Sequence, residues 1–239
     1  MVGKESILNE LLSQISGKSP AEAISIVYQS HPSQTVFSTS FGIEDQVITH
    51  LIAQHAVGVN IFTLDTGRLF PETYSLWSTT IEKYGLKINA FSPQADALND
   101  FLATHGPNSF YTSVEHRKTC CDIRKVRPLQ KALAGNKIWI TGIRAEQSLN
   151  RDGMKMLEWD ETNQLIKFHP LMNWTYDQVK EYVAKNNVPY NPLHDRGFVS
   201  IGCAPCTRAI KEGEDFRAGR WWWEDNSKKE CGLHSHNKH

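Results

Sequence analysis

The hydrophobic positions near the start of the chain follow the spacing of an amphipathic helix. Apolar residues recur there at intervals of three and four, at Ile7, Leu8, Leu11, Leu12 and Ile15. Gly17 is expected to end this helix. Ser19-Pro20 combines an N-cap residue with a proline in the first turn, which predicts a second helix that ends near His31-Pro32.

Downstream, β-rich runs alternate with helical patterns. The runs predict strands over residues 35–39, 59–64, 86–91 and 137–141. Helices are expected from Glu44 to about His55, from Pro71 to Tyr84, after Pro93, and around Cys120-Cys121. This alternation predicts an α/β fold with a doubly wound, mostly parallel sheet. Such sheets bind ligands beyond the carboxyl ends of their strands.

The last third of the chain changes character. Residues 154–159 and 165–169 read as a hairpin, and a helix follows from Thr175 to about Asn186. From about Asp225 onward the residues are rich in Lys, Asn and His and almost free of apolar side chains. The sequence therefore predicts one α/β domain over residues 1–224 and a mobile tail over 225–239.

Composition narrows the function classes. The chain has 239 residues, a formal net charge of zero and a pI near 7.1, so no global field attracts nucleic acid or an anionic membrane. The N-terminus has no apolar signal region, and no apolar run approaches the length of a membrane span. Five cysteines without an export signal favour a cytoplasmic protein whose thiols serve metals or catalysis.

Four of the five cysteines form two clusters, Cys120-Cys121 and Cys203-Ala204-Pro205-Cys206. Thiolates two residues apart can share one metal centre. An adjacent pair cannot easily place both sulfurs on one small tetrahedral ion, whereas an iron–sulfur cluster has ligand positions that lie farther apart. Buried free cysteines or a disulfide framework are the alternatives, but scattered core cysteines are not usually clustered in this way. A metal or iron–sulfur site is the favoured interpretation.

Three loops that follow predicted strands have nucleotide-binding character: residues 38–45, 64–68 and 141–144. The first combines hydroxyl groups, a glycine and a helix N-terminus, which together suit an anion. It lacks the glycines and the lysine of a Walker loop or a dinucleotide fingerprint. Alone, it is equally compatible with an ordinary strand–helix turn. Its repetition after other strands favours a nucleotide site.

Basic residues flank both cysteine clusters. Those near the first are Arg117, Lys118, Arg124, Lys125 and Arg127, and those beyond the second are Arg208, Lys211, Arg217 and Arg220. They form either a solvated helix surface or a pocket for phosphate or sulfate. Their position on both sides favours the pocket. The run Trp221-Trp222-Trp223 is expected to serve packing or an interface.

The fifth cysteine stands in the polar tail, within Glu230-Cys231-Gly232-Leu233-His234. Cys231 is either an incidental exposed thiol or a nucleophile. A nucleophilic thiol needs a lowered pKa or a nearby base, which His234 or the arginines could supply.

Taken together, these motifs resemble the assimilatory adenylyl-sulfate (APS) reductases. The resemblance rests on both cysteine clusters, on residues 213–223 and on the tail motif 230–234, and it spans Ser38 to His234. It implies an adenine nucleotide alpha-hydrolase-like sheet and a [4Fe-4S] cluster on Cys120, Cys121, Cys203 and Cys206. The related phosphoadenylyl-sulfate (PAPS) reductases typically keep the tail cysteine and lack the other four, so this chain is expected to use APS.

The resemblance also implies a two-step thiol mechanism for cysteine biosynthesis. Cys231 would attack the sulfur of APS, release AMP and become S-sulfocysteine, and a thioredoxin- or glutaredoxin-like dithiol would then release sulfite. The residues implied at the phosphosulfate are Lys125, Arg144, Arg217 and Arg220. Those implied at the nucleotide are Ser40, Asp45 and Thr66. The cluster is expected to position Lys125 rather than to exchange electrons.

The chain departs from the pattern of related proteins at two positions. Phe41 and Ile43 stand where ATP-splitting relatives have small residues, and they are expected to crowd a triphosphate.

Three alternative functions are PAPS reduction (alone or beside APS reduction), an iron–sulfur tRNA thiolase, and a zinc- or cluster-bearing redox sensor. The sensor leaves three nucleotide-type loops unexplained. The sequence leaves the oligomeric state open, a homo-oligomer included.

Overall fold

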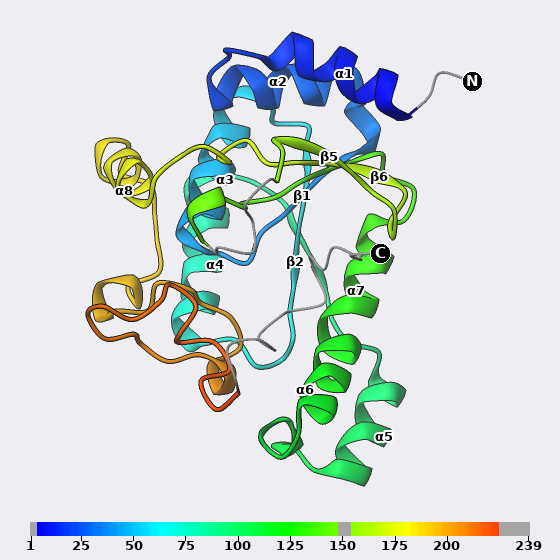
Figure 1. Cartoon of the computed structure of the whole chain (residues 1–239), viewed down its shortest axis with the longest axis vertical. Coiled ribbons are helices and arrows are strands. Elements are labelled where there is room, and N and C mark those ends of the chain that lie inside the picture. The colour runs from blue at the N-terminus through cyan, green and yellow to red at the C-terminus, as the bar shows by residue number, and fades with distance from the viewer. Residues whose placement is uncertain (1–3, 148–153, 225–239) are drawn as a thin grey trace.

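The sheet of this protein has six strands in the order β3-β2-β1-β4-β6-β5. A computed structural model describes residues 4–147 and 154–224 (Figure 1). The strands are β1 (Thr35–Ser38), β2 (Asn60–Leu64), β3 (Ile88–Phe91), β4 (Ile138–Ile140), β5 (Leu157–Asp160) and β6 (Leu165–Phe168). All neighbours pair in parallel except β5, which runs antiparallel to β6. The predicted mostly parallel sheet is therefore confirmed.

The helices lie on both sides of this sheet (Figure 1). They are α1 (Lys4–Ile15), α2 (Pro20–Ser30), α3 (Ile43–His55), α4 (Pro71–Tyr84), α5 (Ala95–His105), α6 (Val114–Cys121), α7 (Arg127–Leu133) and α8 (Tyr176–Lys185). A π-helical turn over Asp122–Val126 joins α6 to α7. Figure 1 shows α5, α6 and α7 as a column apart from α3 and α4.

Local capping explains why several helix ends could be read from the sequence. The Ser19 hydroxyl accepts the backbone N–H of Glu22 at 3.3 Å, and the Glu22 carboxylate accepts the N–H of Ser19 at 2.9 Å. Thr175 and Gln178 form the same capping box at the start of α8. Gly85 ends α4 at a φ of +63°, which a residue without a Cβ adopts at no steric cost.

Alternating strand residues build two cores, one on each face of the sheet. The larger core packs α1 to α4 and α8 against one face and includes Phe37, Ile61, Ile138 and Ile140. The smaller core packs α7 against the other face and includes Val36, Phe62, Leu129, Leu133 and Trp139. Because neighbouring strand residues enter different cores, the sheet is buried on both faces, as a doubly wound fold requires.

The segment after α8 lies over the carboxyl ends of the strands, where it is coloured orange to red in Figure 1. A buried ion pair ties its last described residue to α6. Arg117 donates from Nε to Glu224 Oε1 at 2.9 Å and from Nη2 to Oε2 at 2.8 Å. The two side chains are only 1% and 3% exposed, so this bidentate pair fixes residue 224 beside the helix that ends in Cys121.

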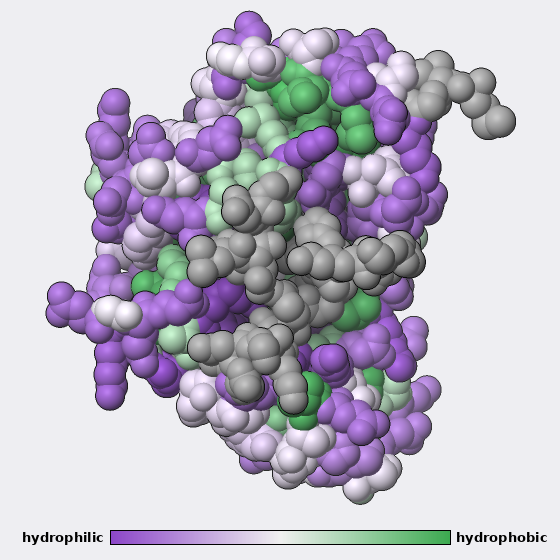
Figure 2. Space-filling view, in the orientation of Figure 1, coloured by the Kyte–Doolittle hydropathy of each residue, from purple (hydrophilic) through white to green (hydrophobic). Residues whose placement is uncertain are grey.

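The surface of the described residues is mainly polar. Figure 2 shows a face dominated by hydrophilic residues, with smaller hydrophobic areas between them. Val57 is the most exposed of the large apolar side chains, at 69%. Within the described ranges, no helix combines the length and the apolar character that a membrane crossing needs.

The buried pair gives a stability prediction. Glu224→Ala should lower the free energy of unfolding by about 3–5 kcal/mol, because Arg117 would remain buried without its carboxylate. Denaturant titration of both proteins measures the difference. Glu161→Ala removes the exposed ion pair with Lys4 and should change the stability little. Similar values for the two variants would contradict the prediction.

Candidate functional site

A cavity of about 250 Å³ opens at the carboxyl ends of β1, β2 and β4. One wall consists of the three strand-end loops singled out in the sequence, with Ser40, Thr66 and Gly142 among the lining residues. The C-terminal segment forms the opposite wall, including residues 199–203 and 216–217. The parallel sheet brings the loops together because its strands end at one edge.

Asp45 lines this cavity from the first turn of α3. Its Oδ2 accepts the Ser40 backbone N–H at 2.6 Å and the Ser40 hydroxyl at 2.7 Å. Burial raises the pKa of Asp45 to about 6 and the Glu44 charge adds to this, whereas the bonds from Ser40 oppose it. Gly142 packs directly on this carboxylate, and a Cβ at position 142 would overlap Asp45 Oδ1. Here the glycine is needed for close approach.

The loop between β1 and α3 turns its aromatic side chain away from the cavity. Phe41 has a φ of +59°, an unusual value for a residue with a Cβ. Its ring is buried and stacks on Trp77 with centroids 5.6 Å apart. Ile43 is also buried in the larger core. Neither side chain lines the main cavity, so the structure shows no contact through which they would crowd a triphosphate there, and that expectation stays a prediction.

Three of the four predicted phosphosulfate ligands, Lys125, Arg217 and Arg220, line the main cavity. Arg220 is 5% exposed, donates to Thr207 Oγ1 at 2.9 Å and lies 5.0 Å from the centre of the Trp221 ring. A Cβ at Gly202 would overlap its guanidinium. The guanidinium is therefore held between the backbone of residue 202 and an indole face.

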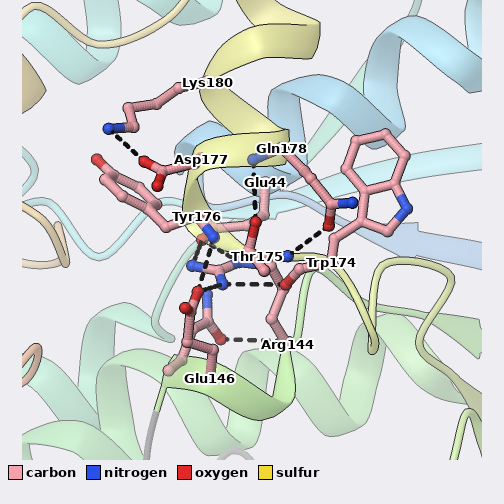
Figure 3. A network of polar contacts seen from close by, with 10 residues as sticks. Glu44, Arg144, Glu146, Trp174, Thr175, Tyr176, Asp177, Gln178 and Lys180 are labelled. Carbon is pink, nitrogen blue, oxygen red and sulfur yellow. Dashed lines mark hydrogen bonds and ion pairs between the residues drawn. The ribbon is translucent and has the colours of Figure 1, made fainter.

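The fourth, Arg144, is placed differently. It is fully buried and outside the cavity lining. Figure 3 shows its guanidinium between two carboxylates: Nε donates to Glu44 Oε1 at 2.9 Å and Nη1 to Glu146 Oε2 at 2.7 Å. Nη1 also lies 3.3 Å from the Trp174 carbonyl, and the Tyr176 N–H donates to Glu146 at 2.7 Å. Arg144 thus joins the starts of α3 and α8 to the loop after β4, and its contact with substrate stays a prediction.

A second cavity adjoins the first and is lined by all four clustered cysteines. Other residues that line it are Arg68, Arg117, Arg124, Lys125 and Arg220. Thr66 links the two cavities, since its hydroxyl lies 3.3 Å from Cys203 Sγ and its carbonyl accepts Arg124 Nη1 at 2.6 Å. The π-helical turn directly after Cys121 includes both Arg124 and Lys125.

The thiol cavity brings together four cysteine side chains that could serve as metal ligands. None of its four cysteines is in a disulfide. Burial raises the pKa of Cys206 to about 11, and Cys203 adds to this, whereas Arg220 and Lys125 oppose it. Thiolates here therefore need a cationic partner. Within residues 4–147 and 154–224, no three His, Cys, Asp or Glu side chains gather closely enough for one metal ion. Four thiols around one cavity with cationic neighbours have the donor atoms of a metal centre, and the [4Fe-4S] cluster stays a prediction.

Other predicted residues lie elsewhere, and one buried pair was missed. Cys231 and His234 fall in residues 225–239, outside the described ranges. Trp221 is buried against Cys203 and Cys206, which agrees with a packing role. The Thr141 hydroxyl, in the cavity wall, lies 2.6 Å from Nδ1 of the buried His169, a contact that was not predicted. The position of both residues at strand ends is the one sequence signal that points to it.

Comparisons with known proteins agree with this geometry. The family model described as phosphoadenosine phosphosulfate reductase domain matches residues 34–209. A protein of Agrobacterium fabrum named adenosine 5'-phosphosulfate reductase is 52% identical over 84% of this chain and 77% of its own length. A protein of the same name from Allochromatium vinosum is 50% identical over 83% and 78%.

Solved structures support the same fold. The crystal structure of phosphoadenylyl-sulfate (PAPS) reductase from Candida auris, a phosphate complex, has a TM-score of 0.72 and 27% identity. The similarity covers 88% of this chain and 98% of that one. A Candida glabrata FMN adenylyltransferase in complex with ATP has a TM-score of 0.53 and 15% identity over 90% and 70%. This second likeness concerns the fold alone.

The raised pKa of Asp45 gives a pH prediction. An unfolded aspartate has a pKa near 3.9, so between about pH 4 and 6 the native state holds a proton that the unfolded state releases. Native stability should therefore rise as the pH falls through 6. Relative to Asp45→Asn, the wild type should gain about 1 kcal/mol of unfolding free energy between pH 7.5 and 5.

Denaturant titrations of both proteins at the two pH values test this. Ser40→Ala is the matched variant, because loss of the hydroxyl bond to the carboxylate should move the change to higher pH. If the wild type and Asp45→Asn differ by the same amount at both pH values, the assigned pKa is incorrect.

Proposed function

The chain belongs to the phosphoadenosine phosphosulfate reductase domain family, and on this premise we propose that it reduces adenylyl sulfate to sulfite and AMP in sulfate assimilation. The observation that favours this reaction is the shared wall of the two cavities. Lys125, Cys203 and Arg220 line both the strand-end cavity and the four-thiol cavity. A cationic site beside four clustered thiols, in a chain about half identical to proteins named APS reductase, fits this substrate.

In this proposal the nucleotide occupies the main cavity with its phosphosulfate toward the thiol side. Lys125, Arg217 and Arg220 bind the anionic end, where lysine acts as a point charge and arginine as a planar fork. Ser40, Asp45 and Thr66 line the nucleotide end. The AMP phosphate becomes a better leaving group when these cations hold it, since they stabilise the charge that develops during cleavage.

We propose a [4Fe-4S] cluster on Cys120, Cys121, Cys203 and Cys206. When bound, it would supply a fixed charge beside the cavity and would not exchange electrons with the substrate. The chain's own residues hold its ligands in place: the Thr66 hydroxyl contacts Cys203, and Arg124 lies beside Cys120. The same arrangement orients Lys125, four residues after Cys121, toward the main cavity.

The chemical steps balance with thiols as the source of electrons. The Cys231 thiolate forms a bond to the sulfate sulfur, the bond from sulfur to the bridging oxygen breaks, and AMP leaves with the electron pair. One thiolate of a thioredoxin- or glutaredoxin-like dithiol then attacks Cys231 Sγ, and sulfite leaves with two electrons. The second thiol resolves the mixed disulfide, so the reductant ends as a disulfide and Cys231 returns to the thiolate.

The adduct predicts a specific mass change. Anaerobically purified protein incubated with APS and no reductant should gain the mass of one sulfonate group and release one AMP. Cys231→Ser should gain nothing and should lose essentially all turnover. Intact-protein mass spectrometry and nucleotide chromatography measure both. A wild type that reacts with PAPS and not with APS would support PAPS reduction instead, and adduct formation on Cys231→Ser would exclude Cys231 as the nucleophile.

The packing of Arg220 on Gly202 predicts that two different variants share one defect. Arg220→Ala should lower kcat/KM for APS by about 10- to 100-fold, the range expected for a charged hydrogen bond. Gly202→Ala should reproduce most of this loss, because its Cβ would displace the guanidinium. Steady-state kinetics with a reduced dithiol partner measures both. A Gly202→Ala enzyme with normal kcat/KM would show that Arg220 is not held in this position for catalysis.

A further inference from the structure

His194 begins a short 3₁₀ turn, His194–Arg196, and lines the main cavity. Buried hydrogen bonds tie down the loop that presents it. The fully buried Asn191 donates from Nδ2 to Thr73 Oγ1 at 3.1 Å, and its Oδ1 accepts the Leu193 N–H at 3.0 Å. The His194 N–H donates to the Asn191 carbonyl at 3.0 Å. These bonds hold the backbone of His194 at the cavity wall.

The ring of His194 is not satisfied by the protein. Both of its nitrogens are shielded from solvent, and neither has a hydrogen-bond partner among the described residues. The Phe198 carbonyl lies near the ring but outside hydrogen-bonding geometry. The residue as a whole is half-buried, so its exposed part consists of other atoms. A half turn about the Cβ–Cγ bond exchanges the nitrogen and carbon positions of the ring, and the contact inferred below requires the orientation in which a nitrogen faces the main cavity.

Charges around the ring restrict what it can bind. Burial lowers the pKa of His194, and the carboxylates of Glu44 and Asp195 oppose this shift. The lowered pKa favours the neutral ring, which has one donor and one acceptor nitrogen. The two nearby carboxylates disfavour an anion here. The cations Lys125 and Arg220 line both the main cavity and the thiol cavity, whereas His194 does not line the thiol cavity. A neutral group that both donates and accepts, such as a hydroxyl, suits this ring.

We propose that His194 is a substrate-binding residue whose imidazole hydrogen-bonds a ribose hydroxyl of the adenine nucleotide. The assignment rests on the proposed function, because it takes the nucleotide as the occupant of the main cavity. This assignment gives the two ends of the ligand different partners. Cations bind the phosphosulfate, and the neutral His194 ring, with carboxylates nearby, binds the sugar. A buried nitrogen without a hydrogen-bond partner costs free energy. One of the two ring nitrogens gains a partner when the nucleotide binds.

Two substitutions test the contact. His194→Phe keeps a planar ring of similar size and removes both nitrogens, whereas His194→Gln keeps one donor and one acceptor. Calorimetry with AMP should show about three- to tenfold weaker binding for the Phe variant and a smaller loss for the Gln variant. KM for APS should rise by a similar factor with little change in kcat, because the ribose contact is the same before and during sulfur transfer.

Deoxynucleotides identify the partner group. Either 2'-deoxy-AMP or 3'-deoxy-AMP should bind the wild type more weakly than AMP, and this difference should disappear in His194→Phe. The assignment is overturned if His194→Phe binds AMP as tightly as the wild type. It is also overturned if that variant keeps the full discrimination, which would indicate a contact to the base or a purely structural ring.

Failure of the His194 contact can be distinguished from failure of the proposed reaction. A wild type that binds AMP with this pattern and does not turn over APS contradicts the proposed reaction and leaves the His194 contact standing. If His194→Phe does not fold, the deoxynucleotide comparison on the wild type still decides. Equal affinity of the wild type for all three nucleotides overturns the assignment without any variant.

Discussion

The ion pairs of the buried Arg144 guanidinium with two carboxylates hold together the end of the protein that contains the main cavity. Removing an arginine from water costs several kcal/mol unless carboxylates replace the lost hydration, and Glu44 and Glu146 provide this for Arg144. The three residues belong to segments that are up to about one hundred positions apart in the chain. Because Glu44 opens α3 and stands next to Asp45, the same junction fixes the base of the main cavity. A ligand therefore meets a surface that is already ordered.

The two cavities behave as parts of one site because single residues belong to both. Thr66 faces the nucleotide cavity and contacts Cys203 through the same hydroxyl. Lys125 lies on the wall between them, within the π-helical turn that follows Cys121. A change of charge among the four thiols is thus felt by the cation expected to hold the substrate. The proposed metal centre would act on the substrate through this cation, without donating electrons.

Local patterns predicted most of the fold, and long-range contacts account for most of what they missed. Alternating apolar residues located the strands, and capping residues such as Ser19 and Gly85 located helix ends, because these signals depend on neighbouring residues only. The pairing of Arg144 with Glu44 could not be read in this way. The burial of the Phe41 ring depends on a positive φ at this residue, which the sequence does not predict. Gly142 is required by a carboxylate about one hundred residues away, a contact that only the folded chain reveals.

The anchoring of Glu224 on Arg117 has a kinetic consequence for the thiol that follows it. Cys231 comes seven positions later in the chain, so covalent geometry alone keeps its sulfur within roughly 25 Å of the anchor. A tether of this length converts an encounter between two molecules into an intramolecular one, with an effective concentration on the order of millimolar. For the proposed reaction, Cys231 is thus part of the same chain segment as Arg217 and Arg220, and no separate association step between thiol and site is needed.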